Sequence, residues 1–467
     1  MAEAATVGRT SPSDPALRRS PLVPAVVFGA TWLAWFGVLQ WSVVRFRTPI
    51  VLTLTLGAVL LVLWLARRVR VGLPSRVAAV VLLGSVVLTL TVPLFSYLRG
   101  GWLTAALTVV TVGGVVTAGL LALSGRAAAL AAFGTAMVGQ AVLTAVTVVG
   151  DPAPRIDVWV ILQQGADLTA RLGNVYTATW TGSPGVQDHF TYLPWMAVLT
   201  APGRWVAGDV RWMIGIWSLV LLAGLWTLAG GRRGDVARGA AVVGLVVFAP
   251  GTITQVDQAW TEPVLAALLV WWAVLVRRGH AWWAVIPLAL ACASKQHLAL
   301  LAPVLLLWHP FGWRRTLVTG GVAGVLLSPW LLADPAAFVD DTVTTLLTFH
   351  PIEFANTWYL YFLNVHGVEL PFAVTGLFMV GAVGVAAWMV WRRRPGVDEV
   401  LLWLAFVLAV ANLVNKQAFY NQFWLVAVLV AAAVAAAGPP TGTDEPPEEA
   451  GDPVSAPAGR GAAATDG

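Results

Sequence analysis

The sequence predicts an all-α protein that crosses a membrane many times. Of its 467 residues, 58% are hydrophobic and only 11% are charged, and the mean hydropathy is +0.78. These values lie well outside those of soluble globular domains. A bilayer core needs about 20 apolar residues per helix. We predict about 14 membrane helices, several of them short, at residues 23–39, 50–66, 77–98, 102–123, 127–149, 212–228, 240–253, 264–276, 282–294, 298–308, 317–332, 371–391, 400–414 and 423–437.

The apolar runs divide the chain into four predicted parts. Residues 1–22 form an N-terminal segment with no small-residue cleavage site after it, which indicates a retained first helix rather than a signal peptide. Closely spaced N-terminal helices follow at 23–126, and a transmembrane unit with a large loop at 150–211 occupies 127–437. The acidic segment 438–467 is rich in Pro, Gly and Ala, a composition typical of disorder.

The basic residues predict the orientation, because Lys and Arg accumulate in cytoplasmic loops. With both termini in the cytoplasm, 18 Lys and Arg fall inside and nine outside, the 438–467 segment excluded. The loop at 150–211 then lies outside. Six of the outer basic residues suggest an anionic ligand on that face: Arg155, Arg171, Arg204, Arg211, Lys295 and Lys416.

The segment from about 151 to 191 is the densest polar stretch before residue 438 and carries Asp157 just beyond a predicted span. For an ionisable group at such a boundary, a functional role is the first hypothesis. The apolar stretch 192–206 follows; if it crossed the membrane, the arginines after residue 230 would lie outside. We therefore predict an interfacial helix there.

A second interruption is Lys295-Gln296-His297, inside an apolar stretch of about 28 residues. A single crossing would place one of two arginine pairs outside, whereas two short segments meeting at Lys295 keep both inside. The turn would then be recessed in the membrane, and paired short segments point to a binding site.

Several classes of function find no support. The chain has no Walker loop and no glycine-rich nucleotide fingerprint, so an ATP-driven pump is not expected, and no cofactor is predicted. The single Cys292 excludes an intrachain disulfide or a cysteine metal cluster. Asp340 and Asp341 lack a third ligand in the sequence, so no metal is predicted. The net charge of +5 reflects membrane topology, not binding to nucleic acid.

An ordered set of motifs resembles a known group of enzymes. It comprises Asp157-Val-Trp with the later Tyr176, Phe190-Thr-Tyr-Leu-Pro194, Gln258-Ala-Trp-Thr-Glu-Pro263, Ser294-Lys-Gln-His297 and Asn415-Lys-Gln-Ala-Phe-Tyr-Asn421. Over about residues 127–437 the chain resembles the GT-C integral membrane glycosyltransferases, most closely the family 87 mannosyltransferases that use polyprenyl-phosphate sugars. It departs from them in its extra N-terminal helices and in Leu193, where their pattern has proline.

The resemblance implies a GT-C-like fold, with a catalytic first outer loop, and an inverting transfer without a metal. Asp157 would be the general base; its plainer interpretation is a charge at a helix end. Asp167 and Asp188 are alternative bases. Lys295 would bind the donor phosphate, although an ammonium group that reaches the membrane interface is the structural alternative. The other expected substrate-binding residues are Arg155, Arg171, Tyr192, Glu262, Gln296, His297, Lys416 and Asn421.

The predicted function is transfer of a sugar, with mannose favoured, from a polyprenyl-phosphate donor to a lipid, glycan or protein acceptor on the extracytoplasmic face of the cell membrane. Nucleotide sugars are made in the cytoplasm, so an outward site needs a flipped lipid carrier. A flippase or other transporter of lipid-linked sugars is the main alternative, although internal repeats are not evident. A ligase or polymerase of the O-antigen type is another; it would rely on outer Arg and His residues.

Overall fold

A computed structural model describes residues 22–69 and 72–438. These residues form helices and loops without a strand, which confirms the predicted all-α class. Apart from Leu22 and Gly438, the segments predicted at 1–22 and 438–467 lie outside the described residues. Eight helices are long and apolar enough to span a membrane, as expected of a multi-pass membrane protein. They are α1 (Leu22–Ser42), α2 (Thr48–Arg67), α4 (Gly100–Leu123), α5 (Arg126–Gly150), α8 (Val210–Leu228), α14 (Gly312–Ala333), α18 (Phe372–Arg393) and α19 (Val397–Val414).

The predicted count of 14 membrane helices is not confirmed, because the other six apolar runs contain shorter helices. These are α3 (Ser75–Thr91), α9 (Val236–Val247), α11 (Glu262–Arg277), α12 (Val285–Cys292), α13 (Ala302–Leu307), which follows η4 (Gln296–Leu301), and α20 (Tyr420–Ala436). Local chemistry explains the end of α9: Pro250 has no N–H to continue a helix, and Gly251 has φ +80°.

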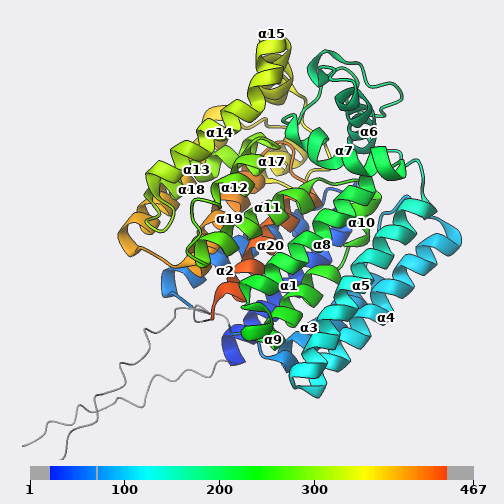
Figure 1. Cartoon of the computed structure of the whole chain (residues 1–467), viewed down its shortest axis with the longest axis vertical. Coiled ribbons are helices and arrows are strands. Elements are labelled where there is room, and N and C mark those ends of the chain that lie inside the picture. Colours follow the sequence, from blue (N-terminus) through cyan, green and yellow to red (C-terminus); the bar gives the residue numbers. More distant parts are fainter. Residues whose placement is uncertain (1–21, 70–71, 439–467) are drawn as a thin grey trace, which may run out of the picture.

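Short helices gather at one end of the bundle, which we call the loop end (Figure 1). They are α6 (Asp157–Ala170), η2 (Val175–Thr177), α7 (Trp195–Ala207), α10 (Ile253–Asp257), α15 (Pro335–Val339), the π-helical turn η5 (Asp340–Thr344), α16 (Thr345–Thr348) and α17 (Trp358–His366). Helix α7 runs across this end of the bundle, where an interfacial helix was predicted at 192–206 (Figure 1).

The opposite end carries most of the arginines, and we call it the arginine end. Three arginines there join separate elements. Arg277 donates to the carbonyls of Ala436 and Gly438. Arg126 donates to the carbonyl of Arg232 in η3 (Gly231–Arg233), and Arg393 donates to that of Leu65. Among the described residues, these basic residues assigned to one side of the membrane lie at one end. Which end faces the cytoplasm stays a prediction.

Helices α11 and α20 lie at the centre of the bundle, and nearly all of their residues are buried. Close contacts between helices depend on small residues, as in membrane bundles generally. At Gly224 of α8, for example, a β-carbon would lie 2.8 Å from Val270 of α11. Because both central helices run between the two ends, they fix the loop-end residues relative to one another.

The stretch that contains Lys295 is broken as predicted. Helix α12 ends at Cys292 and η4 begins at Gln296, so Lys295 lies between two short segments. Both segments return to the arginine end: Arg315 lies 5.1 Å from the Trp282 ring before α12, and Trp308 after α13 donates to the carbonyl of Pro395. The turn at Lys295 therefore belongs to the loop end.

Candidate active site

Asp157 is the first residue of α6 and lies under a crossing segment of the same loop. Its Oδ1 accepts a hydrogen bond of 2.8 Å from the Val158 N–H. At Gly185, a β-carbon would lie 3.0 Å from Asp157 Oδ2, so the chain passes directly over the carboxyl group. Burial raises the pKa of Asp157, although backbone donors, among them the Val186 N–H, favour its ionised form. A carboxyl with a raised pKa is a better proton acceptor.

Lys295 and Glu262 form a buried ion pair. The Lys295 Nζ lies 2.5 Å from Glu262 Oε1 and 3.5 Å from the Thr261 hydroxyl. The Glu262 side chain is fully buried, and that of Lys295 is 12% exposed. Glu262 also begins α11, where the helix dipole favours a carboxylate. The sequence had suggested separate ligands for these residues, whereas the structure binds them to each other, because opposite charges with little water compensate one another.

Tyr192 joins this ion pair to Asp157. The Lys295 Nζ lies 5.4 Å from the centre of the Tyr192 ring, within the range of a cation–π contact. Burial raises the pKa of the Tyr192 hydroxyl well above its usual value, and the nearby carboxylates of Glu262 and Asp157 raise it further. Asp157, Tyr192, Glu262 and Lys295 are therefore one group, which we call the Asp157–Lys295 cluster.

Gln296 holds the segment that carries Tyr192. Its side-chain amide donates to the carbonyls of Thr191 at 3.1 Å and Thr342 at 3.3 Å. The Leu193 N–H also donates to the carbonyl of Ser294 at 3.3 Å. The turn at Lys295 thus binds the chain on both sides of Tyr192. His297, half-buried in η4, follows directly.

The structure does not bring every predicted binding residue to the cluster. Arg155 is exposed and precedes α6, whereas Arg171 is exposed at the other end of α6, about 20 Å from Asp157. Lys416 donates to the carbonyls of Leu347 and Phe349, at 2.8 and 2.5 Å. Asn421 is buried at the start of α20, and its Oδ1 lacks a hydrogen bond within the described chain.

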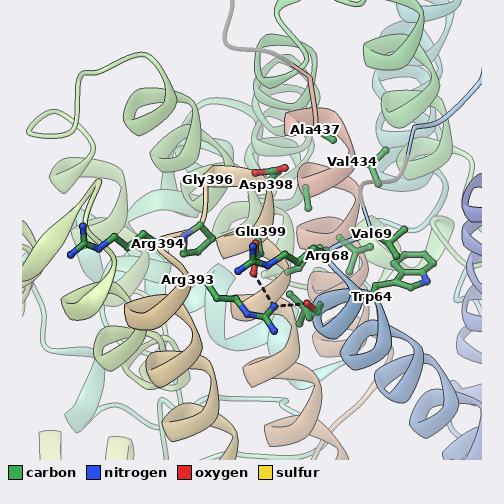
Figure 2. Close-up of a pocket in the computed structure, with 15 residues that line it drawn as sticks. Trp64, Arg68, Val69, Arg393, Arg394, Gly396, Asp398, Glu399, Val434 and Ala437 are labelled. Atoms are coloured by element: carbon green, nitrogen blue, oxygen red, sulfur yellow. Dashed lines mark hydrogen bonds and ion pairs between the residues drawn. The ribbon is translucent and has the colours of Figure 1, made fainter. Parts of the chain in front are cut away.

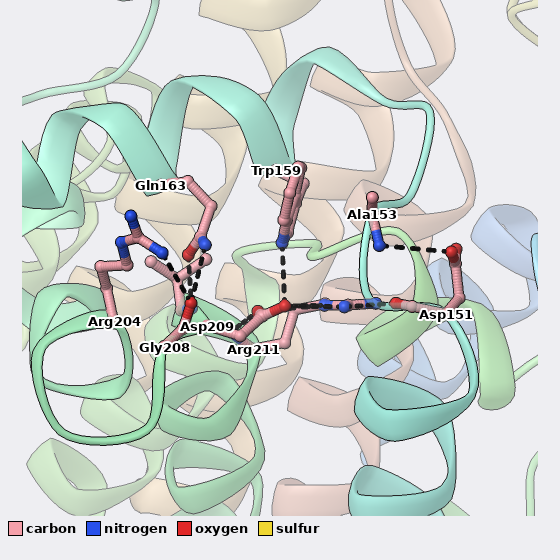
Figure 3. A network of polar contacts seen from close by, with 9 residues as sticks. Asp151, Ala153, Trp159, Gln163, Arg204, Gly208, Asp209 and Arg211 are labelled. Carbon is pink, nitrogen blue, oxygen red and sulfur yellow. Dashed lines mark hydrogen bonds and ion pairs between the residues drawn. The ribbon is translucent and has the colours of Figure 1, made fainter.

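Three of the six basic residues that suggested an anionic ligand on this face are paired with carboxylates: Arg204, Arg211 and Lys295. Arg211 is fully buried and lies 2.7 Å from Asp209, and Figure 3 shows its guanidinium between Asp209 and the backbone of Asp151. Arg204 binds both carboxylate oxygens of Asp167, at 2.9 and 3.0 Å. Asp167, an alternative base, is thus held in an ion pair.

The hydrogen bonds around Arg211 and Asp209 also attach α6 to the turn that precedes α8. The Trp159 indole donates to Asp209 at 3.1 Å, and Gln163 both donates to the carbonyl of Gly208 and accepts from the Val210 N–H (Figure 3). This anchoring fixes the helix that begins with Asp157. The sequence contained a signal for it, since Asp209 stands two residues before Arg211 at the start of an apolar run.

Asp257 is a buried acid that the sequence analysis missed. Its Oδ2 accepts hydrogen bonds from the Ser96 hydroxyl and the Tyr97 N–H, at 2.8 and 2.7 Å. Burial raises the pKa of Asp257 to about 6. Tyr97 in turn donates from its hydroxyl to the carbonyl of Arg155, at 2.8 Å. Asp257 therefore connects α10 and the loop before α4 to the segment that precedes Asp157.

A possible third ligand for Asp340 and Asp341 is His189. Ligand atoms of all three residues lie within 4.8 Å of one another, a spacing that could hold a metal ion. In the structure, Asp341 Oδ1 lies 2.9 Å from His189 Nδ1, and Oδ2 accepts from the Phe190 N–H at 2.7 Å. These contacts attach the chain just before Tyr192 to η5.

Comparisons with known proteins show little. No family model matches the sequence, and no curated protein matches it. Among solved structures, the crystal structure of ArnT from Cupriavidus metallidurans in the apo state matches with 15% identity and a TM-score of 0.41. The match covers 61% of this chain and 56% of that chain, so it spans little more than half of ArnT. A likeness of this size assigns no family, and the function is argued below from the site.

Proposed function

We propose that the chain is a GT-C-type membrane glycosyltransferase that moves a sugar, with mannose favoured, from a polyprenyl-phosphate donor to a lipid, glycan or protein acceptor on the extracytoplasmic face. The observation that carries the proposal is the Asp157–Lys295 cluster, in which a half-buried carboxyl group and a buried lysine share one tyrosine neighbour. The order of sequence motifs supports it independently.

Asp157 would accept the proton of the acceptor hydroxyl as its oxygen attacks the sugar C1. The bond between C1 and the donor phosphate oxygen breaks, and polyprenyl phosphate leaves with the bonding electrons. Attack from the face opposite the leaving group inverts the configuration at C1. The raised pKa of Asp157 favours this proton transfer, and the loop over it limits water.

Lys295 would stabilise the negative charge that develops on the leaving phosphate. The pairing with Glu262 is compatible with this role. The ammonium group has three N–H donors, so it can bind a phosphate oxygen and the Glu262 carboxylate at the same time. Glu262 compensates the charge of Lys295 in a place with little water, and Tyr192 lies beside the lysine.

The transporter alternative is favoured by one feature, the buried ion pair at a break between two short helical segments. Broken helices with ionisable residues are typical of transporters. The two functions make different predictions for Asp157, which lies outside the broken segments. A flippase needs no proton acceptor there.

The test is transfer of labelled mannose from polyprenyl-phosphate mannose in proteoliposomes that contain the full chain. Asp157→Asn is compared with Asp188→Asn, which makes the same change at an exposed position of the same loop. The proposal expects loss of transfer in the first variant only, with donor binding retained. Full transfer by Asp157→Asn would refute the assigned base, and donor translocation without any transfer by the unchanged chain would favour the transporter.

A further inference from the structure

A cavity of about 260 Å³ opens at the arginine end, remote from the Asp157–Lys295 cluster. Its walls are the end of α2, the turn between α18 and α19, and the end of α20 (Figure 2). Helices α2 and α20 are 20 and 17 residues long, so this cavity lies about 25 to 30 Å from their loop-end starts. The proposed transfer reaction uses none of its residues.

Both signs of charge line the cavity, with three arginines and the two acids Asp398 and Glu399. Arg393 lies 3.4 Å from Glu399 and donates to the carbonyl of Leu65 at 2.6 Å. Arg68 and Arg394 are exposed, and neither has an ion pair within the described chain. Arg68 ends α2 in the left-handed region, with φ +50°, and its side chain extends from the helix end toward Glu399 (Figure 2). The Arg68 and Arg393 side chains therefore both lie near Glu399, whereas Arg394 points away from them at the edge of the cavity (Figure 2).

An apolar groove of about 60 Å³ lies next to the cavity, between α1, α2, α19 and α20. Trp64 and Val430 line both spaces, so the polar and apolar parts are neighbours. Gly57 leaves room for the Trp35 ring in the groove wall, because a β-carbon at this position would lie 2.5 Å from that ring. Trp64 stands at the junction, and tryptophan is enriched where headgroups meet hydrocarbon.

We infer that this cavity and groove bind a phosphate-headed membrane lipid, with its phosphate at Arg68 and Arg393 and a hydrocarbon chain along the groove. Basic pockets between membrane helices recognise lipid headgroups in this way. A free phosphate would use the arginines alone and leave the apolar groove without a role. The site is separate from the proposed donor site, so the inference does not depend on the proposed function.

The experiment is native mass spectrometry of the full chain in an uncharged detergent, titrated with dioleoyl phosphatidylglycerol. Arg68→Gln combined with Arg393→Gln should weaken binding of the first lipid by about tenfold or more. Trp64→Ala should weaken it too. Arg278→Gln is the matched control, because Arg278 is an exposed arginine of the same end outside the cavity.

Three results would overturn the inference. The first is full affinity of the double variant for the lipid. The second is an equal loss of affinity in Arg278→Gln, which would indicate a general attraction of the lipid to basic surface. Inorganic phosphate could displace the lipid at equal concentration, which would identify a phosphate site without a lipid. Folding is checked independently, because a misfolded Trp64→Ala would lose the helical circular dichroism that the double arginine variant retains.

Discussion

The ion pair between Lys295 and Glu262 gives a quantitative prediction for stability. Glu262 has no exposed surface, and the Lys295 side chain is only 12% exposed. Removal of one partner from a buried pair costs about 3 to 5 kcal/mol, because the other charge stays buried without compensation. We expect Lys295→Met to cost about 4 kcal/mol, and Glu262→Gln about 3 kcal/mol, because a glutamine oxygen can still accept from the ammonium.

The double substitution distinguishes a true pair from two independent effects. With both charges removed, no buried charge is left alone, so the combined cost should be about 2 kcal/mol, far below the sum of the single costs. Unfolding by denaturant in detergent micelles, followed by tryptophan fluorescence, measures all four proteins.

The pair of Arg204 and Asp167 is the control. Its side chains are 36% and 41% exposed, so its coupling should be only about 0 to 1 kcal/mol. Additive costs for Lys295→Met and Glu262→Gln, or a coupling no larger than that of the control pair, would refute the reasoning.

Further predictions concern the surroundings of Asp157. Because its pKa is raised and its ionised form accepts the proton, transfer should fall as the pH drops through that raised pKa and be complete above it; a pH–rate profile without this acidic limb would contradict the assignment. Gly185→Ala places a β-carbon 3.0 Å from Asp157 Oδ2 and should slow transfer with little change in donor binding, as separate kcat and KM values would show. Tyr97→Phe removes the hydrogen bond to the carbonyl of Arg155 and should cost about 1 kcal/mol of stability, measured as above, while a cost near zero would mean that this bond does not hold the loop.

The sequence was most informative where an ionisable residue stands in an apolar context. Asp157 and Lys295 were found in this way, and the charge balance of the loops located the break at Lys295. These signals are local, and a local pattern does not say which helices are neighbours. The partner of Lys295 is Glu262, 33 residues away, and their contact depends on how α11 packs against α12.

Charge counting could not tell which outer basic residues are ion-paired, for a related reason. It treats every outer arginine as available to a ligand. Arg211 is nevertheless paired with Asp209, and Arg204 with Asp167, 37 residues away. A buried guanidinium must be paired, which accounts for Arg211, whereas Arg204 forms its ion pair at a partly exposed position. Exposed arginines such as Arg155 are the ones that remain available.

Asp257 also explains what the N-terminal helices contribute to the site. Its carboxylate holds Ser96 and Tyr97, which lie between α3 and α4, and the Tyr97 hydroxyl holds the carbonyl of Arg155, two residues before Asp157. Asp257 itself lies in α10, five residues before Glu262. One chain of hydrogen bonds therefore runs from α10, through the loop between α3 and α4, to the segment before α6. Without those N-terminal helices, the segment before Asp157 would lose these hydrogen bonds, whereas the ion pair of Lys295 and Glu262 would stay in place. Removal of the helices should therefore displace Asp157 from Lys295 without unfolding the segment that carries either residue.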